Sequence, residues 1–244
     1  MIMKRFRLLI AVALSVLFVC CGNTTKEGKS ENGQPSSGES KAMADTPTDV
    51  KCLGLAGKVK EVSVTVTDLS SETQESWEDS TQYMRFDEQG RVLKDRYDNL
   101  YKYDDKGEFV YGLSEKSKMK RDEKGRIVYY ENRMDEEDDM GFDIKFEYDG
   151  ADRMTKSVMV GWESTVEDTF TYTEDHIYPD RQNMESEDEG DHFSTVVTYT
   201  YKKFDDNGNW TEREVKSVSK HTIDGEDQGT EEYTQNEKRK ILYY

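Results

Sequence analysis

Hydrophobic and polar residues alternate along most of the chain after residue 50, which is the pattern of β-strands with one buried face. The clearest example is 142–148, where Phe, Ile, Phe and Tyr alternate with Asp, Lys and Glu. In 166–172 the same pattern holds with Asp168 in one apolar place. No window of helical length carries an i, i+3, i+4 apolar stripe. The pattern predicts an all-β domain of roughly ten to twelve strands, because strands average about 5–6 residues and turns are short.

A short turn sequence recurs between these strands. Its order is an aromatic residue, Asp, two polar residues, Gly, a polar residue and an apolar residue. Asp can accept hydrogen bonds from backbone amides, and Gly can take the positive φ that closes the turn. The copies lie at 86–92, 103–109, 121–127, 148–154 and 204–210. The repeat predicts an antiparallel meander of hairpins in a single large twisted sheet, which either stays open or curls into a barrel-like body.

The first twenty residues have a different character. Three basic residues precede an apolar run at 8–19, which is shorter than the roughly 20 residues of a spanning helix and matches a signal-peptide core. The run ends in Cys20 and Cys21, and this ending resembles the lipobox of bacterial lipoproteins, where the acylated Cys becomes the first mature residue. We favour Cys21, because the small Cys20 precedes it, and Cys20 is the alternative. An ordinary secretory signal with incidental cysteines is the other interpretation.

The composition of the next segment is that of a linker. Residues 22–50 contain no aromatic residue, Leu or Ile, and they include several Gly, Ser and Pro. The sequence therefore predicts three parts: a lipoprotein signal peptide at 1–20, a lipidated N-terminus with a flexible tether at 21–50, and a single β-repeat domain at 51–244. More than one acyl chain is needed for stable anchoring. We expect a lipid-anchored protein of the cell envelope at the outer membrane, facing either the periplasm or the outside.

The chain is strongly acidic. It has 34 Lys and Arg against 52 Asp and Glu, a formal net charge of −18. This balance argues against nucleic-acid partners, because phosphate contacts need a basic surface. A hydrophobic content of 34% resembles that of disordered proteins, but 15 Tyr, 9 Phe and 3 Trp favour a folded domain. Anionic lipid surfaces repel such a body, so we expect it to stand off the membrane, held by its lipid.

The repeated turns resemble the YD repeats of Rhs-type proteins, in the degenerate form found in many lipoproteins of the Bacteroidota. Three further segments resemble motifs of such domains: 54–62 the "L.GKVK.V" opening, 206–213 the "GNWT.R" unit, and 239–244 the closing "R.I.YY". Departures are Arg121 in place of the aromatic residue, the shifted Gly150, and the loss of the period at 174–192. The resemblance implies an antiparallel sheet or barrel-like body. It implies no established reaction, so no catalytic residue is predicted.

Candidate metal and cofactor sites are few. The three His are far apart in the sequence and lack metal-site spacing, and the lone Cys52 is expected to be a small buried hydrophobe. Asp205, Asn207 and Glu214 fall at the third, fifth and twelfth places of an EF-hand-like loop, but Lys203 puts a cation in its first place. A β-turn is the favoured interpretation here and calcium the alternative. No cofactor is predicted.

The three Trp residues are the remaining candidates for ligand contact. Trp77, Trp162 and Trp210 could stack on sugars, although packing on the sheet face is the favoured interpretation. Our leading hypothesis is a non-enzymatic, lipid-anchored binding or structural module with a glycan or envelope-protein partner. The alternative is a glycan-processing or glycan-binding envelope protein that uses acidic and Trp residues.

Overall fold

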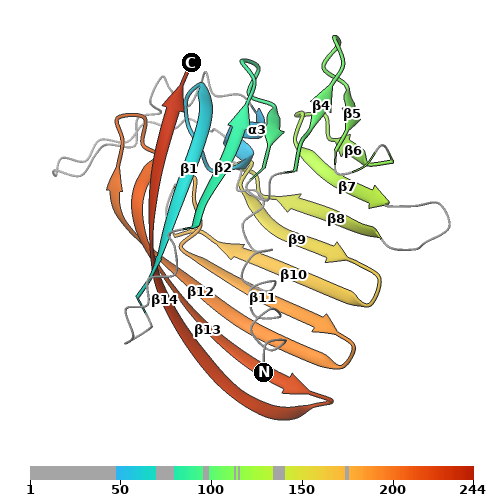
Figure 1. The fold of residues 1–244 in the computed structure, drawn as a ribbon, viewed down its shortest axis with the longest axis vertical. Coiled ribbons are helices and arrows are strands. Elements are labelled where there is room, and N and C mark those ends of the chain that lie inside the picture. Colours follow the sequence, from blue (N-terminus) through green and yellow to red (C-terminus); the bar gives the residue numbers. More distant parts are fainter. Residues whose placement is uncertain are drawn as a thin grey trace.

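A computed structural model describes residues 48–69, 80–95, 99–112, 114, 116–133, 141–173 and 176–244, which form one short helix and fourteen strands (Figure 1). The elements are α3 (Thr48–Cys52), β1 (Val59–Asp68), β2 (Ser80–Phe86), β3 (Val92–Lys94), β4 (Lys102–Tyr103), β5 (Phe109–Tyr111), β6 (Lys118–Arg121), β7 (Ile127–Arg133), β8 (Gly141–Tyr148), β9 (Met154–Val160), β10 (Ser164–Thr171), β11 (Arg181–Asp188), β12 (Asp191–Phe204), β13 (Trp210–Ile223) and β14 (Glu226–Tyr243). The predicted all-β class is confirmed.

Twelve of the strands form one antiparallel sheet in the order β3-β2-β1-β14-β13-β12-β11-β10-β9-β8-β7-β6, and β4 pairs with β5 in a separate hairpin. Neighbours in the sheet are also neighbours in the chain, except that β1 pairs with β14. This arrangement confirms the predicted meander. Within the described residues no strand pairing joins β3 to β6, so the sheet remains open rather than closing into a barrel.

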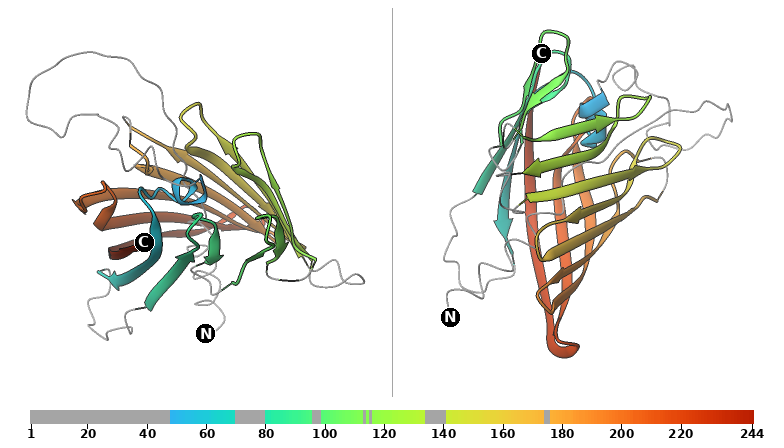
Figure 2. Two further views of the ribbon diagram at one scale, coloured as in Figure 1. Left: turned by 90° about the horizontal axis from the view of Figure 1, so that it is seen from above. Right: turned by 90° about the vertical axis from the view of Figure 1, so that its right-hand side faces the viewer.

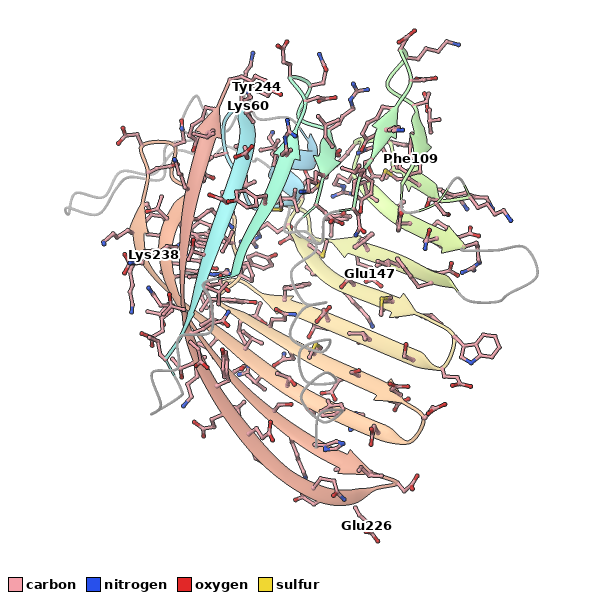
Figure 3. All side chains as sticks on the ribbon, viewed as in Figure 1. Lys60, Phe109, Glu147, Glu226, Lys238 and Tyr244 are labelled. Carbon is pink, nitrogen blue, oxygen red and sulfur yellow. The ribbon has the colours of Figure 1, made fainter. Side chains whose placement is uncertain are left out.

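The sheet is strongly curled. Seen from above, its strands follow an arc, and α3 lies on the inner side of that arc (Figure 2). We call the face that α3 contacts the inner face. Side chains alternate between the two faces along each strand. Lys238 of β14 points away from the interior (Figure 3), which places its neighbours Glu237 and Arg239 on the inner face.

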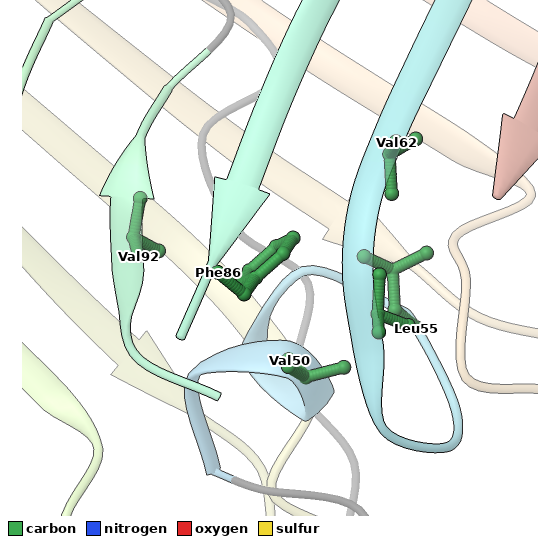
Figure 4. Close-up of a cluster of buried hydrophobic side chains, with 6 residues drawn as sticks. Val50, Leu55, Val62, Phe86 and Val92 are labelled. Atoms are coloured by element: carbon green, nitrogen blue, oxygen red, sulfur yellow. The ribbon is translucent and has the colours of Figure 1, made fainter. Parts of the chain in front are cut away.

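Helix α3 and the loop after it form the first hydrophobic core with the inner face. Val50 and Leu55 are fully buried against Val62 of β1 and Phe86 of β2 (Figure 4). A second core lies under β7 to β10, and Tyr101 contacts both cores. The second core contains Ile127, Tyr130, Ile144, Phe146, Met154 and Phe170. The helix thus fills the space that the curled sheet encloses at one end.

An ion pair explains one departure from the repeat. Arg121 of β6 stands where the repeat has an aromatic residue, and its guanidinium binds the carboxylate of Asp49 in α3, with Nη2 2.9 Å from Oδ2. The Asp49 side chain is only 2% exposed. Asp49 and Val50 lie on the tether side of the predicted boundary at residue 50, yet both pack into the domain.

The five predicted turns share one hydrogen-bonding pattern. In each, the Asp amide donates to the carbonyl four residues later, and the amide three residues later donates to the Asp carbonyl. The Asp carboxylate accepts from the amides two and four residues later. The five residues are Asp87, Asp104, Asp122, Asp149 and Asp205. The recurring Asp is therefore the structural centre of each turn.

Two Asp residues, Asp152 and Asp95, take part in this bonding pattern at positions that the repeat does not predict. In the fourth copy Asp152, with φ 60°, occupies the place that Gly holds elsewhere, and Gly150 does not have positive φ. Asp can adopt this conformation better than most residues with a side chain. Asp95 and Asn99 share two of these hydrogen bonds: the Asp95 amide donates to the Asn99 carbonyl at 3.1 Å, and the Asn99 amide donates to Asp95 Oδ1 at 3.0 Å.

Replacing Asp122 by Ala tests the role of the turn carboxylate. Asp122 accepts bonds from the amides of Lys124 and Arg126 and, at 2.7 Å, from Arg126 Nε. We expect the free energy of unfolding to fall by about 1–2 kcal/mol, measured by urea denaturation, because three acceptor contacts are lost. Glu123→Ala, one residue away at an exposed position, should change it by less than about 0.5 kcal/mol. Equal effects of the two substitutions would contradict this role.

The contribution of Asp122 to the free energy of unfolding is expected to depend on pH. Burial by itself raises the pKa of Asp122, but hydrogen bonds from Arg126 outweigh burial and leave the pKa below its ordinary value. A carboxyl group whose pKa is lowered by folding stabilises the protein above its unfolded pKa of about 3.9, and this contribution is lost as the pH falls. The difference in unfolding free energy between the wild type and Asp122→Asn should therefore shrink between pH 7 and pH 3. A difference that stays constant would refute this explanation.

Candidate functional site

Polar side chains cross the inner face of the sheet in a connected row. Gln182 of β11 is fully buried, and its Nε2 donates to Asp168 Oδ1 at 2.7 Å. Tyr199 of β12 donates to Gln182 Oε1 at 2.6 Å, and Ser157 of β9 donates to Asp168 Oδ2 at 3.2 Å. These strands are neighbours in the sheet, so side chains of one face meet across them. The acidic residue in the apolar register of 166–172 therefore belongs to an internal hydrogen-bond network.

A buried ion pair lies on the next two strands. Arg213 of β13 and Glu237 of β14 are directly paired across the strands, and Arg213 Nε lies 2.7 Å from Glu237 Oε2. Gln235 donates to Glu237 Oε1 at 2.7 Å. Arg213 also lies over the ring of Tyr199, 4.4 Å from its centroid, which joins the ion pair to the polar row. Both charged side chains are at most 10% exposed.

Trp210 brings a second arginine into the site. Its ring is contacted by Arg213, at 4.2 Å from the centroid, and by Arg239, at 3.6 Å. Trp210 is 2% exposed. Arg239 is paired with Val64 of β1, which packs against the α3 core, so the two residues share the inner face. We call Trp210, Arg213, Arg239 and Glu237 the arginine cluster.

The guanidinium group of Arg239 is incompletely satisfied. Its Nε and Nη1 atoms are shielded from solvent and have no hydrogen-bond partner among the described residues. Burial and, second, the charge of Arg213 lower the pKa of Arg239, while Glu237 raises it. A guanidinium stays charged at neutral pH because its intrinsic pKa is so high. The cluster thus holds a buried cation without an acceptor for two of its nitrogens.

The segment 54–62 and the C-terminal strands meet beside this cluster. Asn209 is fully buried; its Oδ1 accepts from the Ala56 amide at 2.7 Å, and its Nδ2 donates to the Ala56 carbonyl at 2.9 Å. Nδ2 also lies 2.7 Å from the Tyr243 hydroxyl, which donates to the Asp205 carboxylate. Burial and this bond to Asp205 raise the pKa of Tyr243 to about 12. Hydrogen bonds of Asn209 therefore join the segments 54–62, 206–213 and 239–244 to one another.

The calcium candidates are not brought together as a site. The Asp205 carboxylate accepts from its own turn and from Tyr243, and the Asn207 amide is one of the turn donors. Glu214 lies on the strand face opposite to that of Arg213 and forms an ion pair with Lys202 at 2.7 Å. Within the described ranges, no group of three or more His, Cys, Asp or Glu could hold a metal ion.

The Trp residues that the structure describes lie in different environments. Trp210 is buried in the arginine cluster, so it is not available for stacking on a sugar. Trp162 lies in the turn between β9 and β10, not on a sheet face, and is 62% exposed. Trp77 and both lipidation candidates, Cys20 and Cys21, lie outside the described residues. Cys52 is buried at the end of α3, as expected.

Sequence reasoning missed the arginine cluster, although a signal was present. Arg239 alternates with the apolar Ile241 and Tyr243, so a charged residue occupies an inward position of a strand, as Asp168 does in β10. Charged residues in an apolar register mark internal polar contacts when the strand is central.

None of the helices in the part of the chain that the structure describes is long and apolar enough to cross a membrane. Neither a protein-family model nor a curated protein matches the chain.

Proposed function

We propose that this chain is a non-enzymatic, lipid-anchored protein of the cell envelope whose β-repeat domain acts as a binding or structural module. The observation that carries the proposal is the order of segments: a signal-like apolar run ending in Cys20 and Cys21, a segment of linker composition that precedes α3, and then a folded domain. Acyl chains on the Cys hold the domain at the outer membrane, and the linker gives it reach.

The proposed partner is a glycan or another envelope protein. Nucleic acid is disfavoured by the net charge of −18. The similarity of the turns to YD repeats supports a scaffold role, because the recurring Asp residues are engaged in their own turns. The inner face, which carries the polar row and the arginine cluster, is the surface that we assign to ligand contact.

A glycan-processing enzyme is the competing proposal. Asp168 and Glu237 are buried carboxylates on the inner face, and such groups can serve as acid and base in glycoside hydrolysis. Each already accepts hydrogen bonds from neighbouring side chains, which favours a structural role. If the purified chain hydrolyses members of a glycan and ester panel, and Asp168→Asn abolishes this activity while Asp105→Asn does not, the enzyme proposal replaces ours.

The anchor is tested by mass spectrometry of the chain expressed in a Gram-negative host. We expect acylation on Cys21, and we expect Cys21→Ala to release the protein from the membrane fraction. Cys20→Ala is the matched control, because Ala is also a small residue before the acylated Cys and should leave acylation intact. Acylation of neither thiol in the wild type would refute the lipid-anchored part of the proposal.

A further inference from the structure

We propose that the arginine cluster is a binding site for a single carboxylate group, with Arg239 as the residue that contacts it. The ligand class is a small carboxylate or the carboxylate of a larger molecule presented to the inner face. This inference deepens the proposed binding role and rests on that role for its biological meaning. Its chemistry does not depend on the lipid anchor.

Arg239 has hydrogen-bonding capacity that its surroundings leave unused. A guanidinium carries five N–H donors in a planar fork, and native proteins satisfy nearly all buried polar groups. Nε and Nη1 of Arg239 are shielded from water and have no acceptor in the part of the chain that the structure describes. Stacking on Trp210 at 3.6 Å favours the positive charge but occupies none of these donors. A carboxylate accepts two hydrogen bonds from one edge of a guanidinium, either from Nε and Nη2 or from the two Nη atoms, so a single carboxylate can satisfy one of the two unpaired nitrogens together with Nη2.

The arginine cluster has more positive than negative charge in direct contact. Arg213 is neutralised by direct contact with Glu237, at 2.7 Å, whereas no carboxylate of the described residues forms an ion pair with Arg239. The charges of Glu237 and Asp205 raise the pKa of Arg239, and no hydrogen bond joins either of these side chains to it. These two carboxylates repel additional negative charge. One negative charge on the ligand is therefore favoured over the two of a phosphate or sulfate.

Arg239 is not completely enclosed by the protein. The Arg239 side chain as a whole is half-buried, so part of it meets solvent although two of its nitrogens do not. The neighbouring Trp210 is buried and Arg213 is held by Glu237, so the surroundings of the guanidinium are preorganised. In such a water-poor site, an ion contact is stronger than at an exposed surface.

The experiment uses the purified full-length chain and sodium acetate as the probe, with sodium chloride at equal ionic strength as the reference. The Nε–H resonance of Arg239, assigned by its absence in Arg239→Met, is followed by NMR during the titration. We expect a saturable shift with acetate. We expect at least tenfold weaker binding in Arg239→Met by calorimetry, and unchanged binding in Arg85→Met. Arg85 is a suitable control because its side chain is 59% exposed on β2.

Three results would overturn the inference. They are an Arg239 resonance that does not respond to acetate, acetate binding that Arg239→Met leaves intact, and phosphate binding tighter than acetate. If Arg239→Met does not fold, Arg239→Lys, which keeps a positive charge and also lacks the guanidinium Nε–H, supplies the assignment, and the wild-type NMR titration then decides the matter. None of these results affects the acylation test, so the failure of the carboxylate site and the failure of the anchored module are distinguishable.

Discussion

Replacing Glu237 by Leu is expected to lower the free energy of unfolding by about 3–5 kcal/mol, because it leaves Arg213 buried without its counter-ion. Arg213 and Glu237 are in contact at 2.7 Å, and both are nearly buried. The effect is increased by Arg239, whose charge already lies over the same Trp210 ring. Urea denaturation, followed by the tryptophan fluorescence, measures the difference.

The same substitution at an exposed ion pair of β14 is the control. Glu232 contacts Lys216 at 2.9 Å, but their side chains are 62% and 52% exposed. Glu232→Leu should cost no more than about 1 kcal/mol, since exposed pairs contribute little. The double variant Arg213→Met with Glu237→Leu should recover much of the loss, because the charge of Arg213 is removed together with its counter-ion. Equal effects of Glu237→Leu and Glu232→Leu would refute the importance of burial here.

Replacing Trp210 by Ala is the second large expected effect. Trp210 is 2% exposed, and two guanidinium groups lie over its ring. We expect a loss of about 3–5 kcal/mol in unfolding free energy, since truncation leaves a cavity in a packed site. The separation of Arg213 and Arg239 from the ring adds to this loss, because each cation–π contact contributes about 0.5–2 kcal/mol.

Trp162→Ala removes the same side chain from the turn between β9 and β10, where it is 62% exposed. It should change the unfolding free energy by less than about 0.5 kcal/mol. Denaturation of both variants at one pH gives the comparison. A loss below about 1 kcal/mol for Trp210→Ala would show that the cluster is less tightly packed than its burial indicates.

Local sequence patterns were sufficient for the strands and for most of the turns. Period-two alternation follows directly from the geometry of a pleated strand, so 142–148 could be assigned to β8 without knowledge of its neighbours. The turn repeat has a local cause as well, because each Asp carboxylate bonds to amides within four residues. The hydrogen bonds between Asp95 and Asn99 were not predicted, because the sequence 95–99 lacks the Gly that made the other copies recognisable.

The contacts that build the candidate site are of a different kind. Asn209 meets Ala56 across 153 residues, and Arg121 meets Asp49 across 72. The sequence around an arginine in a strand does not indicate which residue its side chain will contact. Arg121 could be noted only as a departure from the repeat, and Arg239 only as a charge in an apolar register. Their roles depend on which strands become neighbours.

By itself, the sequence determined an all-β meander with Asp-centred turns, since backbone geometry and hydrogen bonds within four residues are sufficient for both. The tertiary structure decided that the sheet stays open, that β1 pairs with β14, and that α3 packs on the inner face. It also decided that Trp210, Arg213 and Arg239 meet. Inward side chains contact residues that are distant in the sequence. Which residues they contact depends on the curvature of the sheet and on long-range strand pairing, and both of these are properties of the whole sheet.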